Sequence, residues 1–127
     1  MAAPLLLDTD VLVDYLRGRT EAVAYLEART ETLLVSAITV AELFAGVREG
    51  EERPLLEQFL SAFEIVALSR EIARAGGLYR RDYGPSHGVG LADALIAATA
   101  EFRQARPVTL NARHFPMLSV EVPYQKD

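Results

Sequence analysis

The sequence predicts an α/β fold in which helices flank a parallel, five-stranded sheet. Short apolar runs that are continuous rather than alternating indicate strands buried on both faces of such a sheet. Between these runs lie segments with apolar residues at helical spacing, and strands that alternate with helices favour parallel pairing. Half of the 127 residues are hydrophobic, which is enough for one core. We therefore expect a single domain over residues 1–127.

The first half of the chain predicts two strands and four helices. Residues 5–8 form the first strand, and apolar residues then recur at helical spacing over 11–16 until Gly18 stops the helix. Thr20 can cap a second helix, and residues 33–36 form the second strand. The remaining elements are a helix from Thr39 to about Val47, a charged turn "REGEER", and a helix with Pro54 in its first turn and an apolar stripe at Leu55, Leu56, Phe59, Leu60 and Phe63.

The second half predicts three more strands. Residues 64–68 form the third strand, and Ser69 caps a helix that continues to about Tyr83. The stretch "GPSHGVG", residues 84–90, contains three glycines and a proline and predicts a loop. The remaining elements are an alanine-rich helix over 91–102, a fourth strand over 107–110 and a short fifth strand over 119–122.

Composition limits the partners and the location. The net charge of −5 excludes a general electrostatic attraction to nucleic acid, so RNA binding would need a local basic patch. There is no cysteine, which excludes disulfides and thiolate metal sites. The sequence has no apolar stretch of membrane-spanning length and no signal segment, so we expect a cytoplasmic protein without a membrane partner. Candidate phosphate contacts are Arg17, Arg80, Arg81, Arg103 and Arg113.

Four oxygen-bearing side chains are expected at one edge of the sheet. Asp8 ends the first strand, Glu42 follows the second, Asp93 lies in the first turn of the helix before the fourth, and Asn111 follows the fourth. Ligand sites in parallel sheets lie beyond the carboxyl ends of the strands. Two carboxylates about 4 Å apart repel by roughly 4 kcal/mol, so a cluster needs a cation or raised pKa values. Mg²⁺ or Mn²⁺ prefers such oxygen ligands and can promote phosphodiester hydrolysis.

Each of these side chains also has a structural interpretation when taken alone. Asp8 or Asp10 could cap the first helix. Glu42 closes a capping-box match, "TVAE", while Asp93 could complement a helix dipole and Asn111 could be a turn residue. Their shared placement at one edge of the sheet favours the common site.

Four stretches resemble the PIN-domain ribonucleases, and in particular the toxin half of VapBC toxin–antitoxin pairs. They are "LLLDTDVLVDYL", "VSAITVAELFAGV", "GLADALIAATA" and "TLNARHFPML", and they occur in the family's order over nearly the whole chain. The resemblance implies a PIN-like sandwich around a parallel five-stranded sheet. It also implies an endoribonuclease that uses Mg²⁺ or Mn²⁺ to hydrolyse RNA.

The resemblance also assigns roles to individual residues. It implies that Asp8 and Asp93 are the principal metal ligands and that Glu42 is a ligand or orients the attacking water. The fourth acidic position, often Asp in the family, is Asn111 here, where an amide could hold a metal-bound water. Losing this charge weakens the case for a second metal ion but not for the first. Two residues match small hydroxyl positions that could bind the carboxylates or a phosphate: Thr9 and Thr109.

Partners are also implied by the resemblance. They are a second copy of the chain, in a homodimer, and a small VapB-type antitoxin whose C-terminal segment docks beside the acidic pocket. The apolar helix pair within residues 39–63 is a candidate groove for that segment. Alternatively, Phe59 and Phe63 belong to the core. His114 matches no familiar zinc spacing, and we interpret it as structural.

Three other functions are compared with this one. Residues 84–88 match the G-x-S-x-G pattern of a serine hydrolase, which requires a strand before the serine and a helix after it. A phosphoacceptor signalling domain normally needs a lysine near the last strands, and this chain has none before Lys126. The third alternative keeps the fold, as a PIN-type RNA-processing nuclease or an inactive RNA- or partner-binding relative.

Overall fold

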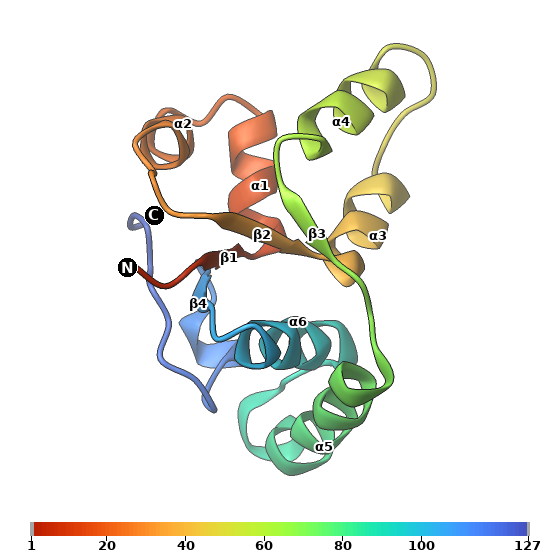
Figure 1. The fold of residues 1–127 in the computed structure, drawn as a ribbon, viewed down its shortest axis with the longest axis vertical. Helices are drawn as coiled ribbons and strands as arrows, with labels where there is room; N and C mark the ends of the chain where they lie inside the picture. Colours follow the sequence, from red (N-terminus) through yellow and green to blue (C-terminus); the bar gives the residue numbers. More distant parts are fainter. Residues whose placement is uncertain (1, 127) are drawn as a thin grey trace.

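A four-stranded parallel sheet forms the centre of the molecule. The computed structural model describes residues 2–126, and the strand order is β3-β2-β1-β4. Helices α1 to α4 cover one face of this sheet, and α5 and α6 cover the other (Figure 1). The predicted α/β sandwich is therefore confirmed. The strands are β1 (Leu5–Leu7), β2 (Leu33–Ser36), β3 (Glu64–Val66) and β4 (Arg106–Val108), so β3 and β4 end two residues earlier than predicted.

The fifth strand predicted near the C-terminus is reduced to one parallel bridge between Val108 and Glu121. At this bridge the Glu121 N–H donates to the Pro107 carbonyl at 2.8 Å, and the Thr109 N–H donates to the Glu121 carbonyl at 3.0 Å. The next ladder bond on either side would need the N–H of Pro107 or of Pro123. Proline has no N–H group, so the pairing stops after one residue pair.

Side-chain caps decide where the helices of the first face begin. Asp8 caps α1 by accepting from the Thr9 N–H, and Ser36 caps α3 by accepting from the Ile38 N–H. The predicted start of α3 at Thr39 was therefore wrong, and the capping box that would use Glu42 does not form. The predicted side-chain cap of α2 is also absent, because its N-cap residue is an arginine. These helices are α1 (Thr9–Leu16), α2 (Thr20–Glu27), α3 (Ala37–Ala45) and α4 (Glu52–Leu60).

The second face carries two helices, α5 (Arg70–His87) and α6 (Leu91–Phe102). The loop predicted over residues 84–90 was wrong for its first four residues, which complete the last turn of α5. The ring of His87 packs on Tyr83 one turn earlier, with centroids 5.9 Å apart. Pro85 lies in this last turn and, having no N–H, cannot donate to the carbonyl of Arg81. The left-handed Gly88, with φ of 65°, ends the helix and donates its N–H to the Gly84 carbonyl at 2.9 Å.

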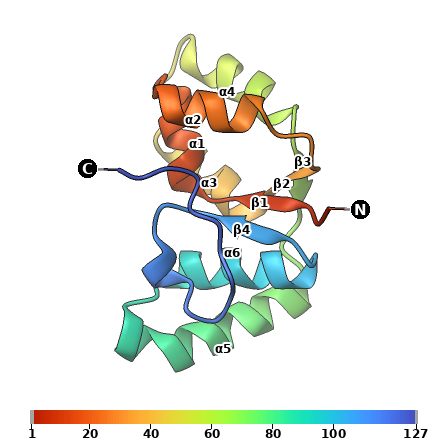
Figure 2. The same ribbon diagram turned by 90° about the vertical axis from the view of Figure 1, so that its left-hand side faces the viewer.

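Both faces of the sheet are buried, as the continuous apolar runs predict. Leu5 and Leu7 pack into the cluster below α1 to α4, while Leu6 between them packs into the cluster against α6. Figure 2 shows the sheet edge-on between the two helical layers, with the segment after β4 running along α6 and back toward α1. This segment begins with a short 3₁₀ helix, η1 (Ala112–His114), which the sequence did not predict. Within residues 2–126, every helix is too short or too polar to cross a membrane.

Candidate active site

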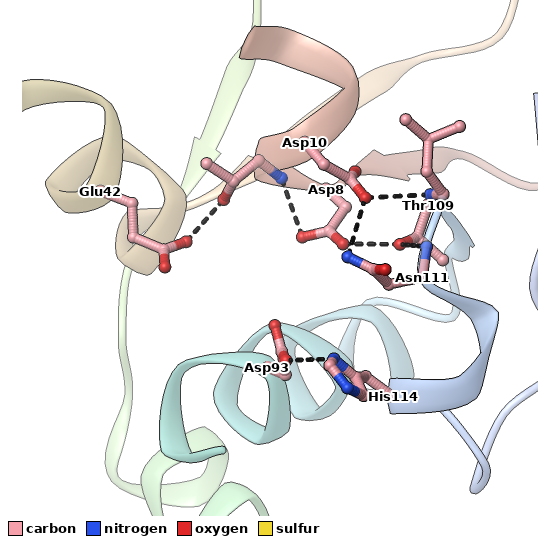
Figure 3. A network of polar contacts seen from close by, with 9 residues as sticks. Asp8, Asp10, Glu42, Asp93, Thr109, Asn111 and His114 are labelled. Atoms are coloured by element: carbon pink, nitrogen blue, oxygen red, sulfur yellow. Dashed lines mark hydrogen bonds and ion pairs between the residues drawn. The ribbon is translucent and has the colours of Figure 1, made fainter. Parts of the chain in front are cut away.

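Asp8 lies at the centre of the site, at the point where β1 turns into α1. Its side chain is buried, with 5% of its surface exposed. One carboxylate oxygen accepts the Thr9 N–H at 2.8 Å, and the other accepts the hydroxyl of Thr109 at 2.6 Å (Figure 3). Asp8 is thus a helix cap and also faces the space beyond the carboxyl edge of the sheet.

The surroundings of Asp8 disfavour its negative charge. Burial, reinforced by the nearby charge of Asp10 and more weakly by that of Asp93, raises the pKa of Asp8 to about 7. The hydrogen bonds from Thr109 and Thr9 stabilise the charged form but do not offset these effects. A buried carboxyl of this kind is stabilised by a proton or by a nearby cation.

Asp10 is a second acid of this site and is half-buried, although the sequence suggested only a capping role for it. One of its oxygens accepts the Leu110 N–H at 3.1 Å and the Asn111 side-chain amide at 3.3 Å. The other oxygen is buried and has no hydrogen-bond partner among the residues that the structure describes. Burial also raises the pKa of Asp10, with Asp14 contributing. An unpaired buried carboxylate oxygen is a position where an ion or water is expected.

Glu42 faces the site from the second turn of α3. Its carboxylate accepts the hydroxyl of Thr9 at 2.6 Å, and that hydroxyl lies 3.0 Å from the hydroxyl of the buried Thr39. Because one hydroxyl carries one proton, Thr9 donates to Glu42 and accepts from Thr39. Glu42 is therefore held by a contact between α1 and α3 rather than by a capping box.

Asp93 approaches from the opposite layer, in the first turn of α6. One of its oxygens lies 3.1 Å from Nδ1 of His114, and each of the two side chains is about one-third exposed. Figure 3 shows the carboxylates of Asp8, Glu42 and Asp93 pointing from three elements toward a shared space. The sequence did not predict the contact with His114, since nothing in it shows how the segment after β4 turns.

The acids face one another but do not form a closed cluster. Within residues 2–126, no three carboxylate or imidazole side chains are grouped closely enough to constitute a metal-binding set. The segment after β4 contacts Asp8, Asp10 and Asp93, whereas Glu42 is held by Thr9 on α1. The atoms that could bind a metal here are all oxygens, and one of them is buried and has no hydrogen-bond partner among the described residues. Oxygen ligands of this kind suit Mg²⁺ or Mn²⁺.

The five candidate arginines are dispersed. Arg81 pairs with its neighbour Asp82 at 2.8 Å, and Arg103 pairs with Glu64 at 2.7 Å at the end of α6 away from Asp93. This position argues against a role for Arg103 at the site. Two arginines are nearer to site residues: Arg17, which caps the far end of α1 and lines a groove with Glu42, and Arg113, which precedes His114 in η1. The remaining candidate, Arg80, lies against Gly84 on α5.

The structure lacks the contexts required by two rival functions. Ser86 lies inside α5, so it is not on the strand-to-helix turn of a serine hydrolase. Lys126 pairs with Asp14 at 2.8 Å, one helical turn beyond Asp10. It does not extend from a strand end toward Asp8, as the lysine of a phosphoacceptor domain would.

Comparisons with known proteins agree with this geometry. A family model described as the PIN domain matches residues 5–118. Ribonuclease VapC19 of Mycobacterium tuberculosis is 43% identical over 124 residues, which cover 94% of this chain and 98% of that protein. Ribonuclease VapC10 of the same organism is 40% identical over 116 residues, covering 89% of this chain and 86% of that one.

Solved structures show the same fold. A toxin–antitoxin complex from Klebsiella pneumoniae contains a chain with a TM-score of 0.84 and 31% identity, and the match covers 96% of this chain and 99% of that one. VapBC2 from Rickettsia felis, bound to a DNA fragment from its promoter, matches with a TM-score of 0.75 and 28% identity, over 93% of this chain and 97% of that one.

Proposed function

This chain belongs to the PIN-domain family, and we propose that it is a metal-dependent endoribonuclease that acts as the toxin of a type II toxin–antitoxin pair. The observation that carries the proposal is the buried Asp8, whose pKa is raised to about 7 and which faces Glu42 and Asp93 across one space. Buried acids whose charge is disfavoured in this way are typical of sites that use them chemically. The relatives named as VapC ribonucleases support RNA as the substrate.

Asp8 and Asp93 are proposed as the principal metal ligands, with Glu42 as a third ligand or as the residue that orients water. Asp10 adds negative charge and an unpaired buried oxygen beside them. When bound, Mg²⁺ or Mn²⁺ supplies positive charge for the phosphodiester and activates the attacking water. Asn111 adds an amide to this set, where it orients Asp10 and can hold a water.

The hydroxyl groups of the chain orient its acids before substrate binds. Thr109 fixes one oxygen of Asp8, and Thr9 fixes one oxygen of Glu42. The other oxygen of Asp8 accepts the Thr9 N–H, and each of its two oxygens keeps one lone pair for a ligand or a proton. Arg17 and Arg113 remain the candidate phosphate contacts, because Arg17 lines the same groove as Glu42 and Arg113 lies in η1 beside His114. Such orientation reduces the reorganisation needed when RNA arrives.

A groove beside the site suits the antitoxin. It has a volume of about 500 Å³ and lies between α1, α3 and α4. Its apolar wall includes the exposed side chains of Leu16 and Leu55, and Glu42 connects it to the acidic site. The fold's neighbours in toxin–antitoxin complexes support assigning this groove to a segment of an antitoxin. Phe59 and Phe63 pack against the core instead, as the alternative interpretation of the sequence held.

The remaining parts of the proposal are a homodimer and a cytoplasmic location. The family resemblance favours the first, and the absence of a spanning helix within residues 2–126 is compatible with the second. Sedimentation of the purified chain would measure its oligomeric state directly.

Cleavage of RNA by the purified protein, with Mg²⁺, with Mn²⁺ or with a chelator, tests the activity. Asp8→Asn and Asp93→Asn should each reduce the cleavage rate by ~10²–10³-fold while the protein stays folded, because each removes transition-state charge stabilisation worth several kcal/mol. Asp82→Asn is the matched control, since this exposed acid on α5 contacts Arg81 rather than the site. Full activity in chelator, or in either site variant, would contradict the proposal.

A further inference from the structure

One short segment contacts every aspartate of the site. The segment follows β4 and spans residues 109–114, and each of its contacts lies between 2.6 and 3.3 Å (Figure 3). Its buried neighbour Phe115 anchors it in the core against α6. The side-chain contacts are from Thr109 to Asp8, from Asn111 to Asp10 and from His114 to Asp93.

We propose that His114 is a positioning residue that holds the Asp93 carboxylate toward Asp8. This inference rests on the proposed function, because it concerns how one of the proposed metal ligands is oriented. Nδ1 of His114 lies 3.1 Å from the Asp93 carboxylate. Among the described residues, no other hydrogen bond or ion pair holds that carboxylate.

Without His114, the Asp93 carboxylate could turn toward the N–H groups at the start of its own helix. Asp93 is the third residue of α6, and the N-cap of this helix, Gly90, has no side chain that could accept the first N–H groups. An aspartate in the first turn of a helix is attracted to such unpaired N–H groups. The contact with His114 competes with this attraction and keeps the carboxylate directed into the site.

The backbone at His114 is held by hydrogen bonds within η1 and by the burial of the next residue. Its N–H donates to the Asn111 carbonyl at 2.9 Å, and the N–H of the following residue, Phe115, donates to the Ala112 carbonyl at 3.0 Å. Phe115 is 1% exposed, so the end of η1 cannot shift without opening the core. The backbone from which the imidazole reaches Asp93 is therefore held in place.

The contact with Asp93 is an ion pair when His114 is protonated, and we expect a neutral N–H at the same atom to hold the carboxylate as well. Nδ1–H is available in one neutral tautomer of His114 and in the imidazolium. Asparagine carries an amide nitrogen on the same carbon, Cγ, that bears Nδ1 in histidine. His114→Asn should therefore keep the contact, whereas His114→Leu fills similar space and removes the donor.

Binding of Mn²⁺ to the purified full chain, measured by calorimetric titration, tests the inference without relying on cleavage. The variants are His114→Leu, His114→Asn and Asp93→Asn. Groups that orient metal ligands typically contribute 10–100-fold to metal affinity, so His114→Leu should weaken Mn²⁺ binding by about 10–100-fold. His114→Asn should bind within about threefold of the unsubstituted protein, and Asp93→Asn should be at least as weak as His114→Leu.

Each alternative result has a definite meaning. Unchanged affinity in His114→Leu overturns the positioning role while leaving the proposed function intact, provided that the unsubstituted protein binds Mn²⁺ and cleaves RNA. Equal loss in His114→Asn and His114→Leu also overturns it, because the loss would then reflect packing rather than the donor. An unsubstituted protein that binds no Mn²⁺ overturns the proposed function and this inference together.

Discussion

Replacing Asp8 by asparagine should stabilise the metal-free protein at neutral pH. The substitution removes a charge that the folded protein buries next to Asp10. It leaves the cap of α1 in place, because the asparagine oxygen can accept the Thr9 N–H as the carboxylate does. The amide nitrogen can donate to the hydroxyl of Thr109, which has two lone pairs.

The raised pKa sets the size and the sign of the effect. The folded-state pKa of Asp8 is about 7 against an ordinary value of 3.8, so the folded protein holds this proton more tightly than the unfolded chain. The stabilisation of the folded protein that comes from holding this proton is fully present below pH 4 and is lost as the pH rises through 7. A shift of this size corresponds to about 4 kcal/mol. Asparagine does not titrate, so the Asp8→Asn variant avoids this pH-dependent loss. Its free energy of unfolding should exceed that of the unsubstituted protein by about 2–4 kcal/mol at pH 7.5 and by almost nothing at pH 4.

Urea denaturation in the presence of chelator, at several pH values between 4 and 7.5, measures this difference. In thermal unfolding a gain of 1 kcal/mol corresponds to about 3–5 °C in a domain of this size. Asp82→Asn is the control for removing a negative charge, since Asp82 is exposed and pairs only with the adjacent arginine. If Asp8→Asn were less stable at pH 7.5, or followed the pH dependence of the unsubstituted protein, the argument from burial would fail.

Two further predictions concern packing and the C-terminal segment, and both can be checked by urea denaturation. A Cβ added at Gly76 would lie 2.5 Å from Cδ2 and 3.0 Å from Cα of Leu95, so Gly76→Ala should lower the free energy of unfolding by about 1–3 kcal/mol. A Cβ added at the neighbouring Gly77 would have no atom within 4 Å, so Gly77→Ala should raise the free energy of unfolding by about 0.5–1 kcal/mol. Equal effects of the two substitutions would contradict the close approach of α5 to α6. Tyr124→Phe removes the hydroxyl that donates at 2.8 Å to the buried Asp14, and should cost about 1–3 kcal/mol. An unchanged midpoint would show that Lys126 alone satisfies this carboxylate.

The layered architecture was predictable because few folds satisfy the apolar pattern. Three consecutive leucines cannot all face one side of a strand, so residues 5–7 require cover on both faces of the sheet, and the structure provides it. The fifth strand was predicted but is reduced to one bridge, because of two prolines whose effect depends on the register of pairing. Pro107 and Pro123 block the ladder only in the observed register, and that register is known only once the chain is folded.

Helix ends were predicted less well, because several local signals competed. Ser36 and Thr39 can each cap a helix; the structure uses Ser36, and the buried Thr39 hydroxyl contacts Thr9 on α1 instead. Glycine and proline favoured a loop at residues 84–87, but aromatic packing along α5 outweighed them. At the start of α3 and at the end of α5, the observed helix end goes with a side-chain contact that the local sequence signals do not show.

At the site, positions were more predictable than partners. Asp8, Glu42 and Asp93 could be placed at one edge because strand ends and helix starts share that edge in a parallel sheet. The contributions of Asp10 and His114 depend on how the segment after β4 turns, and the sequence shows no signal for η1. The one available clue to Asp10 was its place two residues after Asp8, in the first turn of the same helix.

The amide at position 111 matters for the balance of charge around Asp10. Asp8 is buried and Asp10 is half-buried, and the charge of Asp10 makes Asp8 harder to ionise. Asn111 donates to one oxygen of Asp10 at 3.3 Å, in addition to the Leu110 N–H. An aspartate at 111 could not donate in its charged form and would bring a further negative charge to the pair. The amide therefore stabilises the ion-free site, and it leaves the other oxygen of Asp10 without a hydrogen-bond partner among the described residues.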